Sequence, residues 1–253
     1  VLVHGSSGNN AATHRMAEGL ARAGVTVFAI DVRGHGASGP HGDIAYYGQL
    51  DDDIADLVKM IDQRLPNERR LLIGHSSGGG FALRIAGGKY ACAFDGFIAL
   101  SPYLNYRSPT NRPNGGWAGP GIARIVGLSI LNRFGVTAFD GLPALAFAIP
   151  ANLPNRTHFY SWRLMRNFGL NMDGWENEIK AIDRPTRVLI GANDELFFAD
   201  QYPATFAKLQ PHIGVSVVPG ADHMGMIIDD SAIAKVTAET KAMLAATPAK
   251  PRC

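Results

Sequence analysis

One short turn constrains this chain more than any other part of its sequence. Residues 74–78 read Gly-His-Ser-Ser-Gly, with the apolar run 71–73 before them and a helical pattern over 81–86 behind them. A serine between small residues, on a turn from strand to helix, is held in a strained backbone conformation that lifts its hydroxyl above the sheet. Ser76 is therefore the predicted nucleophile. A tight turn without a chemical role is the alternative.

Short apolar runs alternate with amphipathic stretches along most of the chain. This pattern is typical of a mostly parallel sheet with helices on both faces. We expect strands at 1–3, 25–30, 71–73, 96–100, 187–190 and 215–218. We expect helices near 11–23, 50–65, 81–86, 203–209 and 231–244. The predicted fold class is α/β, with a mostly parallel, doubly wound sheet.

The alternation breaks between residues 103 and 182. Many Pro, Gly, Asn and aromatic residues occur there without strand alternation. We interpret this segment as an inserted, largely helical cap on a core made of residues 1–102 and 183–247. Residues 248–253 are expected to form a frayed tail.

A serine hydroxyl is a weak nucleophile and needs a base that a third group holds in place. Asp194 follows the expected strand 187–190, and His223 follows the expected strand 215–218. Both residues should therefore lie at the carboxyl edge of the sheet, where catalytic groups gather in open α/β folds. The chain order Ser76, Asp194, His223 is also the one expected for this architecture. We predict that His223 is the base and that Asp194 orients it.

Other roles and other acids compete with this assignment. Asp194 could instead be a solvated loop acid or a helix N-cap, and His223 could be an ordinary loop histidine. Asp222 is a rival acid, but adjacent residues rarely present their side chains to each other with hydrogen-bond geometry. Glu195 is a weaker rival, because Asp194 has the better position in the loop.

The loop after the first expected strand is a candidate oxyanion hole. Residues 4–8 read His-Gly-Ser-Ser-Gly. A developing oxyanion needs two preorganised N–H donors. We predict the backbone amides of Ser77 and Ser6, with Ser7 as the alternative to Ser6. A glycine-rich turn without a catalytic part is the competing interpretation, and His4 is expected to anchor the loop.

Residues 31–38 contain an Asp, an Arg and a His in a glycine-containing loop. This loop follows the wrong strand for the base of a catalytic triad. Its glycines suit a sharp turn, and its polar groups suit bonds to neighbouring loops. We therefore predict a structural loop that braces the loops of the active site.

Composition restricts the partners of the chain. Its 253 residues are 46% hydrophobic and 18% charged, as expected for a soluble globular protein with a large core. The formal net charge is +2 and no run of basic residues occurs, so nucleic acid and anionic membranes are not expected as partners. No stretch approaches the roughly 18 to 20 apolar residues of a membrane helix, so no membrane span is expected.

Taken together, these motifs resemble those of the α/β-hydrolase superfamily, and within it the branch of monoacylglycerol lipase, lysophospholipase and serine aminopeptidase-like hydrolases. The resemblance covers nearly the whole chain outside the cap, through residues 4–5, 31–38, 74–78, 191–194 and 220–223. It implies the fold and the triad but not the substrate, which the cap shapes. Such folds usually begin with an antiparallel strand pair that this chain lacks, so we expect further residues upstream in the natural protein.

The predicted reaction is hydrolysis of a carboxylic ester, lipid-like or with a small acyl group, through an acyl-enzyme on Ser76. A peptidase, an amidase or an acyltransferase using the same triad is the alternative, and the intact triad disfavours a non-catalytic binding protein. The partner is a small-molecule ester, and no metal or organic cofactor is expected. The cap aromatics indicate an apolar acyl pocket or, alternatively, the cap's own core. Homo-oligomerisation is left open, and a cytoplasmic location is a default assignment.

Overall fold

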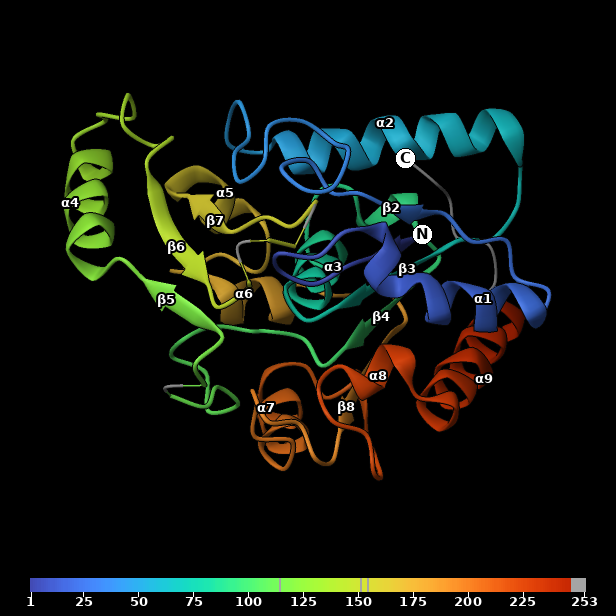
Figure 1. The fold of residues 1–253 in the computed structure, drawn as a ribbon. Helices are drawn as coiled ribbons and strands as arrows, with labels where there is room; N and C mark the ends of the chain where they lie inside the picture. Colours follow the sequence, from blue (N-terminus) through green and yellow to red (C-terminus); the bar gives the residue numbers. More distant parts are fainter. Residues whose placement is uncertain (114, 151, 154, 247–253) are drawn as a thin grey trace.

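The computed structural model describes residues 1–113, 115–150, 152–153 and 155–246. Within these residues, parallel strands form a central sheet in the spatial order β2-β1-β3-β4-β8-β9 (Figure 1). The strands are β1 (Leu2–Val3), β2 (Ala29–Ile30), β3 (Leu71–His75), β4 (Gly96–Leu100), β8 (Thr186–Gly191) and β9 (Gly214–Val218). The predicted parallel sheet is confirmed. The predicted frayed tail, 248–253, lies outside the described residues.

One expected strand is shorter than predicted. In the segment 25–30, only Ala29 and Ile30 pair with the sheet. Their partners in β1 are Leu2 and Val3, and Leu2 N also donates to Phe28 O at 2.9 Å. Residues 25–27 are therefore not part of the paired strand.

Side chains of the strands alternate between two apolar clusters, one on each face of the sheet. In β4, Phe97 and Ala99 belong to one cluster, and Ile98 and Leu100 to the other. The first cluster includes side chains of α2 (Gln49–Arg64), α3 (Ser77–Ala86) and α7 (Gln201–Leu209). The second includes side chains of α1 (His14–Arg22), α8 (Gly225–Ile228) and α9 (Asp230–Ala246). Helices therefore cover both faces, and the predicted doubly wound arrangement is confirmed. Short 3₁₀ turns at Asn10–Thr13 and Ala91–Ala93 complete the connections.

The segment 103–182 contains helices, as predicted, and also a small sheet that the sequence pattern did not indicate. Its helices are α4 (Ile122–Arg133), α5 (Trp162–Asn167) and α6 (Trp175–Lys180). Its antiparallel sheet consists of β5 (Ala118–Pro120), β6 (Pro143–Phe147) and β7 (Phe159–Ser161). These strands are three to five residues long and β5 is exposed throughout, so they lack the alternation that reveals a strand. Figure 1 shows α4 and this sheet at one end of the molecule.

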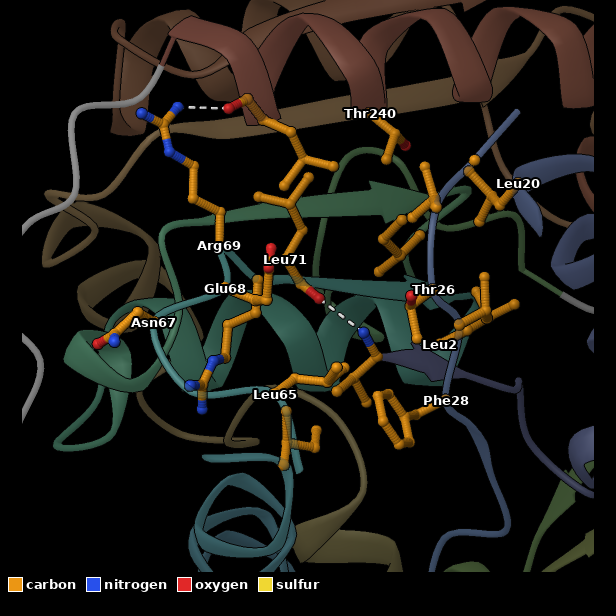
Figure 2. Close-up of a pocket in the computed structure, with 18 residues that line it drawn as sticks. Leu2, Leu20, Thr26, Phe28, Leu65, Asn67, Glu68, Arg69, Leu71 and Thr240 are labelled. Atoms are coloured by element: carbon orange, nitrogen blue, oxygen red, sulfur yellow. Dashed lines mark hydrogen bonds between the residues drawn. The ribbon is translucent and has the colours of Figure 1, made fainter. Parts of the chain in front are cut away.

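A cavity of about 580 Å³ lies at the amino end of the central sheet (Figure 2). Leu2 and Leu71, near the starts of β1 and β3, line it together with Thr26, Phe28 and Thr240. Ser76 follows the opposite, carboxyl end of β3. This cavity is therefore not an acyl pocket for Ser76.

Besides His223, three histidines are buried among the described residues: His4 after β1, His35 in the loop after β2, and His75 at the end of β3. Burial lowers the pKa of His4 to about 4 and the pKa of His75 to about 3. Burial also lowers the pKa of His35 well below its usual range. At neutral pH the folded protein therefore holds all three rings uncharged.

We predict that the folded protein loses stability as the pH falls from about 6.5 to about 5. The unfolded chain protonates these histidines near their ordinary pKa of 6.5, whereas the folded chain protonates His4 only near 4 and His75 near 3. Each therefore removes about 1.4 kcal/mol of unfolding free energy per pH unit in this window. Urea unfolding at several pH values measures the slope.

His75→Gln removes one of the titrating groups and should make that slope shallower. His212→Gln changes an exposed histidine and serves as the matched control, with the slope unchanged. A free energy of unfolding that is independent of pH across the window would contradict this account.

Candidate active site

The predicted nucleophile lies on a sharp turn between β3 and α3. Ser76 has φ 55° and ψ −121°, a left-handed conformation that is costly for a residue with a Cβ. A Cβ on Gly74 would lie 2.0 Å from Gly78 O, and a Cβ on Gly78 would lie 2.3 Å from His4 O. The turn therefore forms only because both positions are glycine.

Asp194 and His223 meet at the carboxyl edge of the sheet, where β8 and β9 end. His223 Nδ1 lies 2.9 Å from Asp194 Oδ2, and both side chains are buried. The other carboxylate oxygen accepts the backbone N–H groups of Leu196 and Phe197 at 3.0 and 2.9 Å. Burial alone would raise the pKa of Asp194, but the hydrogen bond and charge of His223 outweigh it and lower that pKa. An ionised Asp194 accepts a hydrogen bond from Nδ1–H of His223, which leaves Nε2 of the ring unprotonated and able to act as a base.

The two rival acids, Glu195 and Asp222, accept hydrogen bonds from backbone N–H groups of the loop that carries His223. Glu195 Oε2 accepts the backbone N–H of His223 at 3.0 Å. Asp222 Oδ1 accepts the N–H of Gly225 at 2.6 Å. The ring of His223 is thus held by Asp194, while Glu195 and Asp222 hold the loop that carries it.

The histidine of the elbow links the nucleophile to the loop of the base. His75 Nε2 lies 3.0 Å from the carbonyl oxygen of His223, and the two rings have centroids 4.7 Å apart. Within the described part of the chain, no hydrogen bond joins the Ser76 hydroxyl to the His223 ring. Ser76 Oγ and His223 Nε2 are also not among the fully buried polar atoms that lack a partner. Both atoms therefore reach solvent, and such bonds often tighten only when substrate binds.

The loop 4–8 lies directly against the nucleophile, since a Cβ on Gly5 would be 3.0 Å from Ser76 Cβ. Ser7 N donates to the hydroxyl of Tyr160 at 2.9 Å, so this amide is occupied. The amides of Ser6 and Ser77 have no acceptor among the described residues. Between the two predicted candidates in this loop, Ser6 is therefore the one with a free N–H.

The loop 31–38 is tied to the rest of the fold at several points. Asp31 accepts the backbone N–H groups of Asn10 and Ala37 at 2.7 and 2.9 Å. Arg33 forms a two-point ion pair with Asp53 at 2.7 and 2.6 Å. These bonds agree with the predicted structural role of the loop.

Sequence reasoning missed three residues of the segment 103–182 that contact the loop 4–8. Trp117 Nε1 donates to Ser6 Oγ at 3.2 Å, and Thr157 N donates to Ser7 O at 3.4 Å. Tyr160 is the third, through Ser7 N. No motif surrounds these residues, and more than one hundred positions separate each from its partner, so no sequence signal was present.

The part of the chain that the structure describes contains no cluster of three or more His, Cys, Asp or Glu side chains that could hold a metal ion. None of its helices combines the length and apolar character needed to span a membrane.

Known proteins are similar to this chain in sequence and in fold. Residues 1–227 match the family described as serine aminopeptidase, S33. A monoacylglycerol lipase of Mycolicibacterium smegmatis is 32% identical over 108 residues, which span 42% of this chain and 38% of that lipase.

Solved structures agree with the observed architecture. A monoacylglycerol lipase of Paleococcus ferrophilus has a TM-score of 0.69 at 20% identity, covering 96% of this chain and 93% of that one. A soluble variant of monoglyceride lipase from Saccharomyces cerevisiae has a TM-score of 0.67 at 19% identity, covering 96% and 84%. The fold is thus shared, and the family match extends over most of the sequence. This chain therefore belongs to the serine aminopeptidase S33 family of α/β-hydrolases.

Proposed function

We propose that this chain hydrolyses carboxylic esters through an acyl-enzyme on Ser76. The observation that carries the proposal is the buried 2.9 Å hydrogen bond between His223 and Asp194, at the sheet edge where the strained turn presents Ser76. A base oriented by an ionised acid is what a serine hydroxyl requires. Family membership and the similarity to monoacylglycerol lipases support the same reaction.

Acylation begins when Ser76 Oγ attacks the ester carbonyl carbon and its proton passes to His223 Nε2. Asp194 stabilises the resulting imidazolium, and the negative charge on the carbonyl oxygen faces the N–H groups of Ser6 and Ser77. The C–O bond to the alcohol then breaks, and the alcohol leaves with the proton from Nε2. Water repeats the sequence on the acyl-enzyme, so that the carboxylic acid leaves and Ser76 recovers its proton.

Features of the outer helix α4 favour a lipid-like ester as the substrate. One side of α4 packs inward through Leu128. On the opposite side, apolar residues at four-residue spacing face solvent: Ile122 (63% exposed), Val126 (51%), Ile130 (53%) and, just past the helix, Phe134 (79%). We call these four residues the α4 outer face. A helix that is apolar on both sides leaves apolar surface that the rest of the protein does not cover, and such surface marks an interaction site.

Charge near this face points to the kind of surface that it meets. Residues 107–166 contain seven arginines and a single acid, Asp140, which is buried; one of the arginines, Arg163, pairs with Asp43 outside this range. Arg133, at the end of α4, is exposed beside the apolar residues. Basic residues next to exposed apolar ones suit a lipid surface with anionic headgroups. The net charge of the whole chain conceals this asymmetry, so we revise the expectation that anionic membranes are not partners.

A peptidase or amidase would use the same three residues, and the family description favours it as the second candidate. Hydrolysis of p-nitrophenyl esters compared with aminoacyl anilides separates the two. Faster cleavage of the anilides would overturn ester hydrolysis as the main activity.

We predict that Ser76→Ala abolishes hydrolysis of p-nitrophenyl butyrate and labelling by a fluorophosphonate probe, with a loss of at least ~10⁴-fold in kcat. Asp194→Asn should lower kcat by about 10⁴-fold, because His223 then loses its correct tautomer. Asp222→Asn keeps an acceptor for Gly225 N and should stay near the wild-type rate. Wild-type activity in Ser76→Ala would refute the proposed function.

We predict that Ile130→Glu weakens hydrolysis of long-chain monoacylglycerol dispersed in anionic phospholipid vesicles. Removing an apolar contact of this size costs about 1.5–3 kcal/mol, or roughly tenfold or more in affinity for the lipid surface. Hydrolysis of p-nitrophenyl butyrate in solution should not change. Ala238→Glu adds the same charge to an exposed position of α9 and is the control. Equal losses on both substrates would argue against a lipid-facing role for α4.

A further inference from the structure

The candidate oxyanion loop is fastened by residues from the cap. Of its contacts with the segment 103–182, the shortest joins Ser7 N to the Tyr160 hydroxyl at 2.9 Å. Tyr160 belongs to β7 and is buried, as is Ser7. Figure 1 shows β7 in the end of the molecule that also holds β6 and α5. A backbone donor of the core thus depends on a side chain of the cap.

The direction of each hydrogen bond around Tyr160 follows from His35. Nδ1 of His35 faces the carbonyl oxygens of Val32 and Arg33 at 3.2 and 3.3 Å. Carbonyl oxygens only accept, so Nδ1 carries the proton and Nε2 is an acceptor. The Tyr160 hydroxyl, 2.6 Å from Nε2, therefore donates to His35. Its oxygen is left to accept the N–H of Ser7.

The same network reaches the start of the oxyanion loop. His4 Nδ1 lies 2.8 Å from Gly5 O and therefore donates to it. His4 Nε2 then accepts the N–H of Val32 at 3.2 Å. The Val32 peptide thus joins His4 to His35, because His35 Nδ1 uses its carbonyl oxygen. These bonds tie the loops 4–8 and 31–38 into one buried unit whose far end is Tyr160.

Ser7 is the residue in this unit that most needs support. Its φ is 63°, in the left-handed region, where a residue with a Cβ is about 1–2 kcal/mol less stable. Its buried hydroxyl has no hydrogen-bond partner among the described residues. Without Tyr160 its amide would also be buried and unpaired, at a further cost of about 1–3 kcal/mol. The conformation of the turn therefore depends on the Tyr160 hydroxyl.

We propose that Tyr160 is a positioning residue of the oxyanion hole: its hydroxyl takes the Ser7 amide and so holds the turn in which the Ser6 amide is free to face the reacting carbonyl. This inference rests on the proposed ester hydrolysis. It also couples the two parts of the chain, because a displacement of β7 withdraws the hydroxyl and releases the loop. The segment 103–182 then contributes to transition-state stabilisation through Tyr160.

Tyr160→Phe tests the proposal, since it removes the hydroxyl and keeps the ring against Phe147, whose centroid is 4.6 Å away. Loss of a whole oxyanion donor costs about 10²- to 10³-fold in kcat, so a displaced donor should cost roughly 10- to 100-fold, with KM little changed. The affinity of a trifluoromethyl ketone, which forms a tetrahedral oxyanion on the serine, should fall by the same factor. Hydrogen exchange at the Ser7 amide should accelerate.

Tyr47→Phe is the matched control. The Tyr47 hydroxyl donates to Asp140 at 2.7 Å, so this variant also loses a hydrogen bond to the segment 103–182, but one remote from the loop 4–8. It should keep the wild-type kcat. An equal loss in Tyr47→Phe, or an unchanged kcat in Tyr160→Phe, overturns the proposal. If Tyr160→Phe does not fold, exchange in the wild type decides, because a Ser7 amide that exchanges as fast as that of Ser6 also overturns it. Failure of the proposed function registers separately, as retained activity in Ser76→Ala.

Discussion

Gly78 leaves no room for a side chain between the first turn of α3 and the backbone after β1, where a Cβ would lie 2.3 Å from His4 O. This close approach brings the loop 4–8 against Ser76, so the proposed nucleophile lies beside the candidate oxyanion donors. The partial positive charge at the start of α3 is aimed at the same place. Any residue larger than glycine at position 78 would push the loop 4–8 away from the turn that carries Ser76.

Electrostatics around this contact are arranged by burial. His4, His35 and His75 are all buried and uncharged at neutral pH. His4 and His35 each donate one hydrogen bond and accept another, and His75 donates to His223 O. Asp194 is buried as well, yet its bonds to His223 and to two backbone amides keep it ionised. Asp194 therefore places its negative charge beside the His223 ring, whereas the rings of His4, His35 and His75 stay neutral. In the proposed reaction, a developing oxyanion would meet oriented N–H groups.

The segment 103–182 carries out two tasks with different sets of residues. Tyr160, Thr157 and Trp117 reach inward and contact the loop 4–8. The α4 outer face points away from the core and is apolar. If both proposals hold, the segment 103–182 meets a lipid surface through α4 and supports the loop beside Ser76 through Tyr160.

Local patterns in the sequence were sufficient for the parallel strands and for placing the three candidate residues at one edge of the sheet. β4 formed over the predicted residues because all five are buried, and Ser76, Asp194 and His223 follow strands whose carboxyl ends share one edge. The sequence alone did not determine the length of β2 or the short strands of the segment 103–182. No sequence pattern indicated the hydrogen bond between Tyr160 and Ser7, because 153 positions separate the two residues. Sequence patterns report the faces and turns of single elements, whereas hydrogen bonds between distant segments exist only after the chain has packed.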